Sequence, residues 1–264
     1  RSGAQVFVME NVPQLLNSFE HGEIMGTAEA MGFKCWGEVL SAADYGVPQT
    51  RRRAFVVGCK FFDPSQVFPP RRTHYDPRKG GAQTSFLQSD GKSYLPGVVK
   101  WRTVRDAIAD LPRPKGTEIR NDPPPLDLHF GRSPTPMSMA RYKAIPEEGM
   151  NRFDLQKRAP DLTPGCWIRK KSGGTDLFGR LWWDRPAFTI RTEFFKPEKG
   201  RYLHPKQHRP ITHREAARLQ SFPDEFVFTG SKIEIARQIG NAVPPVLAAR
   251  VADVVYLLLT MNNR

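Results

Sequence analysis

In the first quarter of the chain, short apolar runs alternate with apolar residues at helical spacing. Residues 4–9 form a nearly continuous apolar run, which predicts a strand buried on both faces of a parallel sheet. Across residues 13–32 the apolar positions follow helical spacing, and Gly32 marks the expected end of the helix. Further strands are expected at residues 39–40 and 54–58. This strand–helix–strand order predicts an α/β layer.

The pattern changes after residue 68. Residues 69–170 hold many of the 24 prolines, several glycine-rich stretches and only short helix candidates, such as residues 103–111. This composition predicts an irregular second domain with few long helices or strands. Wholesale disorder is the alternative, and the aromatic residues spread through this part of the chain argue against it: Trp101, Phe130, Tyr142, Phe153 and Trp167.

Regular structure is expected again near the end of the chain. Thr212 with Glu215, and Ser231 with Glu234, match the capping box, so helices should begin at Thr212 and Ser231. The pair Pro244–Pro245 should open a final helix. Its apolar face would consist of Val246, Leu247, Val251, Val254, Val255 and Leu258.

Composition narrows the class of protein. With 264 residues the chain can form one large domain or two modest ones. Its 39% hydrophobic and 11% aromatic residues argue against general disorder. Forty Lys and Arg residues against 27 Asp and Glu residues give a net charge of +13. Solubility alone would explain such a charge, but it also favours a polyanionic partner such as nucleic acid.

The cysteine and hydropathy patterns bear on the compartment. The spacing of the three cysteines, Cys35, Cys59 and Cys166, suggests neither a disulfide framework nor a C-x-x-C motif. This favours packing roles in a reducing compartment. The longest apolar run, residues 246–261, is interrupted by charges and too short for a bilayer, and no signal peptide precedes it. We therefore expect an intracellular protein (cytoplasm or nucleoid, or nucleus in a eukaryote) with no membrane partner.

A metal site is not predicted. His204, His208 and His213 have suggestive spacing, but Pro205 and Pro210 prevent the three histidines from sharing one helix face.

Two short polar segments are candidates for chemistry. Glu10 closes the first apolar run, and ligands of open α/β sheets lie beyond the carboxyl ends of strands. A carboxyl group there could pass a proton to a ring nitrogen, although an isolated glutamate more often caps the next helix. In an extended segment Arg51 and Arg53 point to one side and Arg52 to the other. Two guanidinium groups on one side could hold a phosphate and a carbonyl oxygen; a solvated basic face is the alternative.

Three segments in order resemble the later motifs of the cytosine-C5 DNA methyltransferases: Glu10-Asn-Val, Gln49-Thr-Arg-Arg-Arg53 and residues 238–245. The resemblance covers residues 4–62 and 180–262. It also includes residues 218–223, which are similar to a motif that packs the base of the recognition domain and are therefore given a scaffolding role.

The resemblance implies specific roles. Glu10 would protonate N3 of a flipped cytosine, Arg53 would approach its O2 atom, and Arg51 would contact the flanking phosphate. Asn241 and the backbone of Ala242 would contact the amino-acid end of the cofactor, S-adenosyl-L-methionine. The alternative for Gly240 and Asn241 is an ordinary helix C-cap.

The resemblance also implies a fold and a division into domains. We expect an α/β fold in which residues 1–68 and 231–264 form part of an S-adenosylmethionine-dependent methyltransferase (Rossmann-like) sheet. An inserted target-recognition domain would occupy residues 69–230. Within it, a loop carrying Arg169, Lys170 and Lys171 would contact double-stranded DNA.

In the family, the Pro-Cys-Gln nucleophile motif and the glycine-rich cofactor loop precede Glu-Asn-Val. Only nine residues precede Glu10 in this sequence, so we expect the back half of a DNA cytosine-5 methyltransferase, inactive alone. An upstream segment or a partner polypeptide would supply the missing motifs. Restriction–modification is the expected setting. Two alternatives remain at this stage: a non-catalytic DNA-binding module and an RNA cytosine methyltransferase.

Overall fold

A computed structural model describes residues 3–79, 97–169, 174 and 176–261. The chain forms two compact units. The first consists of Arg1–Trp101 and Pro245–Arg264 and is called the sheet unit; the second is Arg102–Pro244 and is called the loop unit.

The sheet unit is built on three antiparallel strands. Strands β1 (Val6–Asn11), β2 (Lys34–Ser41) and β3 (Arg52–Cys59) have the order β1-β3-β2. The parallel arrangement expected for residues 4–9 is wrong, because β1 pairs antiparallel with β3. Burial of β1 on both faces is wrong too, since Val8 is 41% exposed. The most buried strand is instead the central β3, in which residues 54–59 are all buried.

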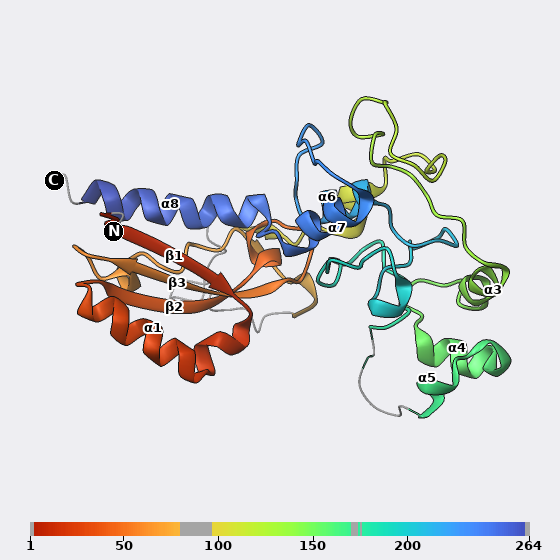
Figure 1. Ribbon diagram of the computed structural model, residues 1–264, viewed down its shortest axis with the longest axis horizontal. Coiled ribbons are helices and arrows are strands. Elements are labelled where there is room, and N and C mark those ends of the chain that lie inside the picture. Colours follow the sequence, from red (N-terminus) through yellow and green to blue (C-terminus); the bar gives the residue numbers. More distant parts are fainter. Residues whose placement is uncertain (1–2, 80–96, 170–173, 175, 262–264) are drawn as a thin grey trace. The chain divides into compact units, whose positions relative to one another are not determined.

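Two helices flank the sheet, which lies between α1 (Phe19–Ala30) and α8 (Pro245–Met261) in Figure 1. The single helix expected over residues 13–32 is divided, because Ser18 is extended and separates the 3-10 helix η1 (Pro13–Asn17) from α1. Gly32, with φ of 84°, follows α1 as predicted. Helix α8 confirms the predicted final helix and buries Leu247, Val251, Val254 and Leu258.

Smaller elements complete the sheet unit. The 3-10 helices η2 (Ala42–Tyr45) and η3 (Pro64–Gln66) lie on either side of β3 in the chain. Two short strands, β4 (His74–Tyr75) and β5 (Val99–Lys100), pair in parallel.

The loop unit has short helices and long connections, as its sequence predicts. The helices are α2 (Val104–Ile108), α3 (Pro136–Ala144), α4 (Arg152–Arg158), α5 (Gly165–Arg169), α6 (His213–Leu219) and α7 (Lys232–Asn241), with the 3-10 turns η5 (Pro160–Leu162) and η6 (Pro197–Lys199). Full capping boxes at Thr212 and Ser231 confirm the predicted starts of α6 and α7. Isolated bridges join Arg180 to Leu203 and Leu203 to Pro210.

Two apolar clusters form the core of the loop unit. The larger gathers side chains from α2, α6, α7 and the connections between them, including Ile108, Leu181, Phe194, Tyr202, Leu219 and Ile239. The smaller consists of Tyr142, Ile145, Leu155, Phe178 and Leu203.

The units divide the chain differently from the expected boundaries after residues 68 and 230. Residues 69–101 belong to the sheet unit, where the Tyr45 hydroxyl donates to the Pro70 carbonyl at 3.0 Å. Helix α7 belongs to the loop unit, where Gly240 lies directly against the main chain of residues 191–192.

No single helix among the described residues is long and apolar enough to cross a bilayer. Helices α7 and α8 reach that length only when counted together across the break between them.

Candidate active site

Glu10 and Arg53 are brought together by the register of the sheet. Glu10 lies opposite Phe55 on β3, and Arg53 lies two residues before Phe55, so all three side chains share one face. Such diagonal neighbours are within reach of long side chains. Arg53 Nε lies 2.9 Å from Glu10 Oε1, and the two side chains are 18% and 25% exposed. The strand pairing therefore creates a partly buried carboxylate–guanidinium pair.

The arginine is further oriented by its own main chain, since Arg53 Nη1 donates to the Arg52 carbonyl at 2.8 Å. Arg52 is exposed, whereas Arg53 is half-buried and Arg51 is 2% exposed. This alternation agrees with the predicted separation of Arg52 from the other two arginines. The burial of Arg51, however, does not fit a direct contact to a DNA phosphate in this conformation.

The turn before β3 holds the arginine segment in place. Its residues Tyr45, Val47 and Gln49 are buried, and the Ala42 amide donates to the Arg51 carbonyl at 2.8 Å. Gly46 has φ of 93°, and a Cβ atom on it would lie 2.7 Å from the His74 ring. Only glycine tolerates both conditions without strain.

Two polar side chains of this turn tie it to the rest of the sheet unit. Burial raises the pKa of Tyr45 to about 12, so its hydroxyl stays protonated and donates to Pro70. Asp44 accepts from Trp101 Nε1 at 3.0 Å and lies 3.5 Å from Arg72 Nε; burial nevertheless raises its pKa. The turn is thus held by side-chain hydrogen bonds just before Arg51 and Arg53.

The predicted cofactor residues lie at the end of α7. Asn241 is the last residue of the helix and is exposed, and Ala242 is its half-buried C-cap in an extended conformation. Gly240 does not form a glycine C-cap, so that alternative is wrong. Instead, a Cβ atom at Gly240 would lie 2.3 Å from Thr192 N and 2.5 Å from Arg191 C. Close packing of α7, rather than a left-handed cap, explains this glycine.

Of the predicted DNA-contacting loop, only Arg169 can be placed. It ends α5 and is exposed. Lys170 and Lys171 lie outside the described residues.

The segment predicted to have a scaffolding role is held by a charge network. Arg218 donates to both carboxylate oxygens of Asp224 at 2.8 and 2.7 Å, and to Asp110 Oδ1 at 2.7 Å. Gln220 Nε2 donates to the Ile239 carbonyl at 2.5 Å, which ties α6 to α7. These bonds agree with the expected structural role.

The three histidines at 204, 208 and 213 have separate partners, and that of His208 is Arg180, whose Nη2 lies 3.4 Å from His208 Nδ1. His204 Nδ1 accepts from the Lys206 and Gln207 amides at 3.1 and 3.0 Å, and His213 Nε2 donates to the Lys232 carbonyl at 2.9 Å. Among the described residues, no group of three His, Cys, Asp or Glu side chains could hold a metal ion.

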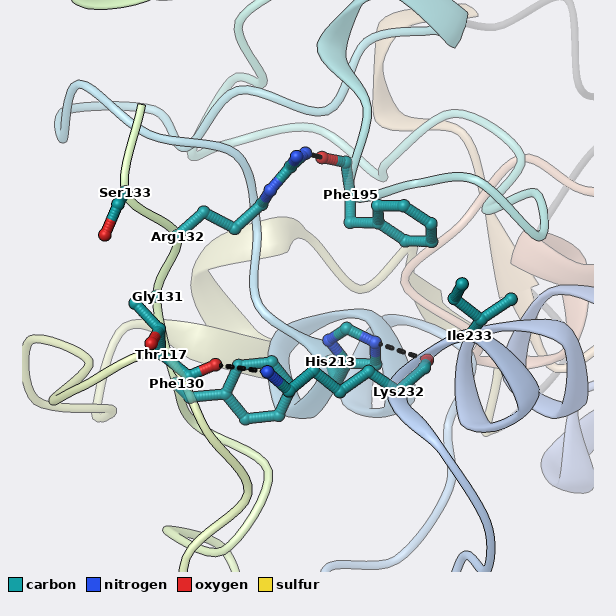
Figure 2. Close-up of a pocket in the computed structure, with 9 residues that line it drawn as sticks. All are labelled: Thr117, Phe130, Gly131, Arg132, Ser133, Phe195, His213, Lys232 and Ile233. Atoms are coloured by element: carbon teal, nitrogen blue, oxygen red, sulfur yellow. Dashed lines mark hydrogen bonds between the residues drawn. The ribbon is translucent and has the colours of Figure 1, made fainter. Parts of the chain in front are cut away.

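One pocket was missed by reasoning from the sequence. It lies wholly within the loop unit, has a volume of about 350 Å³, and is lined by Phe130, Phe195 and His213 together with Arg132 and Lys232 (Figure 2). No linear pattern marks it, because its walls come from five separated places in the chain.

A comparison with solved structures identifies a protein that shares this fold. The fold is shared with a DNA modification methyltransferase encoded within a prophage of E. coli, with a TM-score of 0.60 at 22% identity over 97% of this chain and 70% of that one. The predicted α/β fold is therefore confirmed.

The sequence comparisons are more specific. The C-5 cytosine-specific DNA methylase family matches residues 3–256, and this chain belongs to that family, whose methyl donor is S-adenosylmethionine. It is 32% identical to the type II methyltransferase M1.HphI of Haemophilus parahaemolyticus over 97% of this chain and 57% of the relative. It is 29% identical to DNA (cytosine-5)-methyltransferase 1 of Mus musculus over 89% of this chain and 19% of the relative. The chain thus spans little more than half the length of M1.HphI.

Proposed function

We propose that this chain is the part of a DNA cytosine-5 methyltransferase that binds the Watson–Crick edge of a flipped cytosine and transfers a proton to its N3 atom. The observation that carries the proposal is the pairing of Glu10 and Arg53 at 2.9 Å on one face of the sheet. The turn that leads into β3 fixes the arginine, so the pair is organised before any base enters.

The pair complements the hydrogen-bonding edge of cytosine. A carboxyl group can donate to N3 and accept from the N4 amino group, while a guanidinium donates to O2. Enzymes that act on a base read it in this way once it has left the stack. When the base occupies the donors of Arg53, the Glu10 carboxylate leaves the ion pair, takes up a proton from solvent and shares it with N3. That proton makes C6 electrophilic enough for addition of a thiolate.

Arg51 has a different role in this proposal from the one that the resemblance implies. Its burial and the hydrogen bond to its carbonyl from Ala42 support a function in holding the turn. Contact with a phosphate would require the turn to open.

The cofactor residues fit the proposed ligand. The exposed side-chain amide of Asn241 can accept from the ammonium of S-adenosylmethionine and donate to its carboxylate, and Ala242 adds its main chain. When bound, the cofactor supplies the methyl group that is transferred to C5. Asn241 and Ala242 would orient its amino-acid end.

A second polypeptide segment completes the proposed enzyme. Strand β1 pairs with β3 and has no other strand partner among the described residues. Val8 within the strand is 41% exposed, and Val12 and Phe19, which follow it, are 47% and 78% exposed. An unpaired apolar edge favours association. We propose that the segment carrying Pro-Cys-Gln and the glycine-rich loop pairs there, consistent with the partial coverage of M1.HphI.

The test is transfer of a tritiated methyl group to cytosine-containing duplex DNA. We expect no transfer by this chain alone, and transfer after addition of the polypeptide that carries Pro-Cys-Gln. In the completed enzyme Glu10→Gln should lower the rate by about 10²- to 10⁴-fold and leave DNA affinity within about tenfold.

Glu23→Gln on α1 is the matched control, because Glu23 is an exposed glutamate outside the sheet. Turnover of Glu10→Gln within about threefold of the parent would refute the proton-transfer role. A parallel reaction with cytosine-containing RNA separates the two substrate classes, since transfer to RNA alone would refute DNA as the substrate.

A further inference from the structure

The pocket of the loop unit combines an aromatic wall with a cationic rim. The His213 ring is a neighbour of Phe130 and of Phe195, with ring centroids 4.7 and 6.0 Å apart, and is nearly parallel to Phe195 at 9°. Arg132 Cζ lies 5.7 Å from the centre of Phe195, and Lys232 Nζ lies 5.4 Å from the centre of Phe130. Figure 2 shows the two cations on different sides of the rings.

The hydrogen-bonding state of the histidine follows from its partners. Burial lowers the pKa of His213 to about 4, so the ring is neutral at pH 7. Nε2 must carry its proton, because the Lys232 carbonyl can only accept. Nδ1 is therefore an acceptor, and Figure 2 shows it on the opposite side of the ring from the Lys232 carbonyl.

The cations keep donors available for a ligand. One of the five N–H groups of Arg132 is directed to the Phe195 carbonyl at 2.5 Å, which leaves the planar fork able to hold an anion. Lys232 donates to the Thr117 carbonyl at 2.8 Å and pairs with Glu118 at 2.6 Å, which leaves one donor of three. Arg132 is thus the stronger candidate for the anion, with Lys232 as support.

We propose that this pocket binds a nucleotide unit, with its base against the rings of Phe195 and His213 and its phosphate on Arg132. An aromatic wall accepts any base because every base has a π-face, whereas the cation selects for the phosphate. The volume of about 350 Å³ lies within the range of small-ligand sites. The site is wholly within the loop unit and is separate in the chain from Glu10 and Arg53. It goes beyond the proposed function, because it does not require methyl transfer.

The same chemistry occurs in a free mononucleotide and in a nucleotide of a DNA strand. Calorimetric titration of the full chain with deoxynucleoside monophosphates tests the shared chemistry. The matching nucleosides and deoxyribose 5-phosphate serve as probes that lack the phosphate or the base. Each should bind at least about fivefold more weakly than the monophosphate, because each loses one half of the site.

Variants identify the site. Phe195→Leu keeps apolar bulk but removes the ring, and Arg132→Gln removes the charge; each should weaken binding by about fivefold or more. The matched controls are Phe226→Leu, an exposed ring elsewhere in the loop unit, and Arg237→Gln, an exposed cation on the same helix as Lys232. Both controls should bind as the parent does. Thermal unfolding of each variant checks that the loop unit stays folded.

A competition experiment shows whether the bound nucleotide is free or belongs to a DNA strand. Competition by a single-stranded oligonucleotide at concentrations well below those of the monophosphate supports a nucleotide within a strand, and lack of competition supports a free nucleotide. No saturable binding of any monophosphate, or equal binding by the parent, Phe195→Leu and Arg132→Gln, would overturn the proposal.

Discussion

The sheet unit and the loop unit satisfy their main-chain polar groups in different ways. In the sheet unit, β1, β2 and β3 form continuous antiparallel ladders. In the loop unit, buried arginines take over this task. The Arg180 side chain is fully buried and donates to the carbonyls of Ile145, Gln207 and Tyr142 at 2.9, 2.7 and 3.1 Å.

A second buried arginine of the loop unit also donates to main-chain carbonyls. Arg201 Nη1 donates to the carbonyls of Gly149 and Arg180 at 2.7 and 2.8 Å, and its guanidinium stacks on Trp182. Burial lowers the pKa of both arginines to about 10, which leaves them charged at neutral pH. A guanidinium offers five donors in one plane, so one side chain can satisfy several carbonyls that have no strand partner. A loop-rich domain with few ladders can thus still bury its main chain.

The largest expected effect comes from removing one of these arginines. Arg180→Met should lower the free energy of unfolding of the loop unit by about 3 kcal/mol or more, because several buried carbonyls lose their donor. Arg158→Met is the control, since Arg158 donates to the Ala144 carbonyl at an exposed site and should cost about 1 kcal/mol or less. Hydrogen exchange with mass spectrometry reports the two units separately. Equal losses of unfolding free energy in the two variants would show that the buried arginine does not have the special role described for it.

The second prediction concerns acid. Burial lowers the pKa of His204 from 6.5 to about 4. The unfolded chain therefore takes up a proton first as pH falls, so this contribution to stability is complete above pH 6.5 and is lost toward pH 4. The loss is about 3 kcal/mol for the loop unit.

His204→Asn keeps an acceptor for the Lys206 and Gln207 amides but does not titrate. Thermal unfolding between pH 7 and pH 4 should show a shallower decline in this variant than in the parent. An unchanged decline would show that other groups carry the acid sensitivity.

The third prediction tests helix packing in the loop unit. Gly240→Ala places a methyl group against the main chain of residues 191–192, which cannot move aside as a side chain can. We expect a loss of about 1–3 kcal/mol in the free energy of unfolding. Gly22→Ala, in α1 of the sheet unit, meets nothing within 4 Å and should be neutral or stabilising. A neutral Gly240→Ala would show that α7 is not packed as described.

The smallest expected effect distinguishes two neighbouring arginines of the sheet unit. In the completed methyltransferase, Arg53→Lys should lower the rate of methyl transfer by about tenfold, because an ammonium cannot reproduce the planar fork beside Glu10. Arg52→Lys, on the exposed face, should stay within about twofold. Equal losses at the two positions would contradict the alternation seen in β3.

Local signals in the sequence predicted local structure well. The capping boxes at Thr212 and Ser231 and the final helix after Pro244 are present because caps and helical periodicity depend on residues a few positions apart. The order of the three motifs was enough to predict the family, and strand alternation was enough to separate Arg52 from Arg53.

Tertiary structure decided what depends on residues far apart in the chain. Strand direction was mispredicted because an apolar run shows burial but not the direction of its partner. The role of Gly240 depends on the main chain of residues 191–192, and the role of Arg180 depends on carbonyls 35 and 38 residues away. The aromatic pocket joins residues 117, 130–133, 195, 213 and 232–233. Such contacts follow from packing in three dimensions, which no pattern of neighbouring residues encodes. For Glu10 and Arg53, the sequence motifs identified the two residues, and the register of the sheet brought their side chains together.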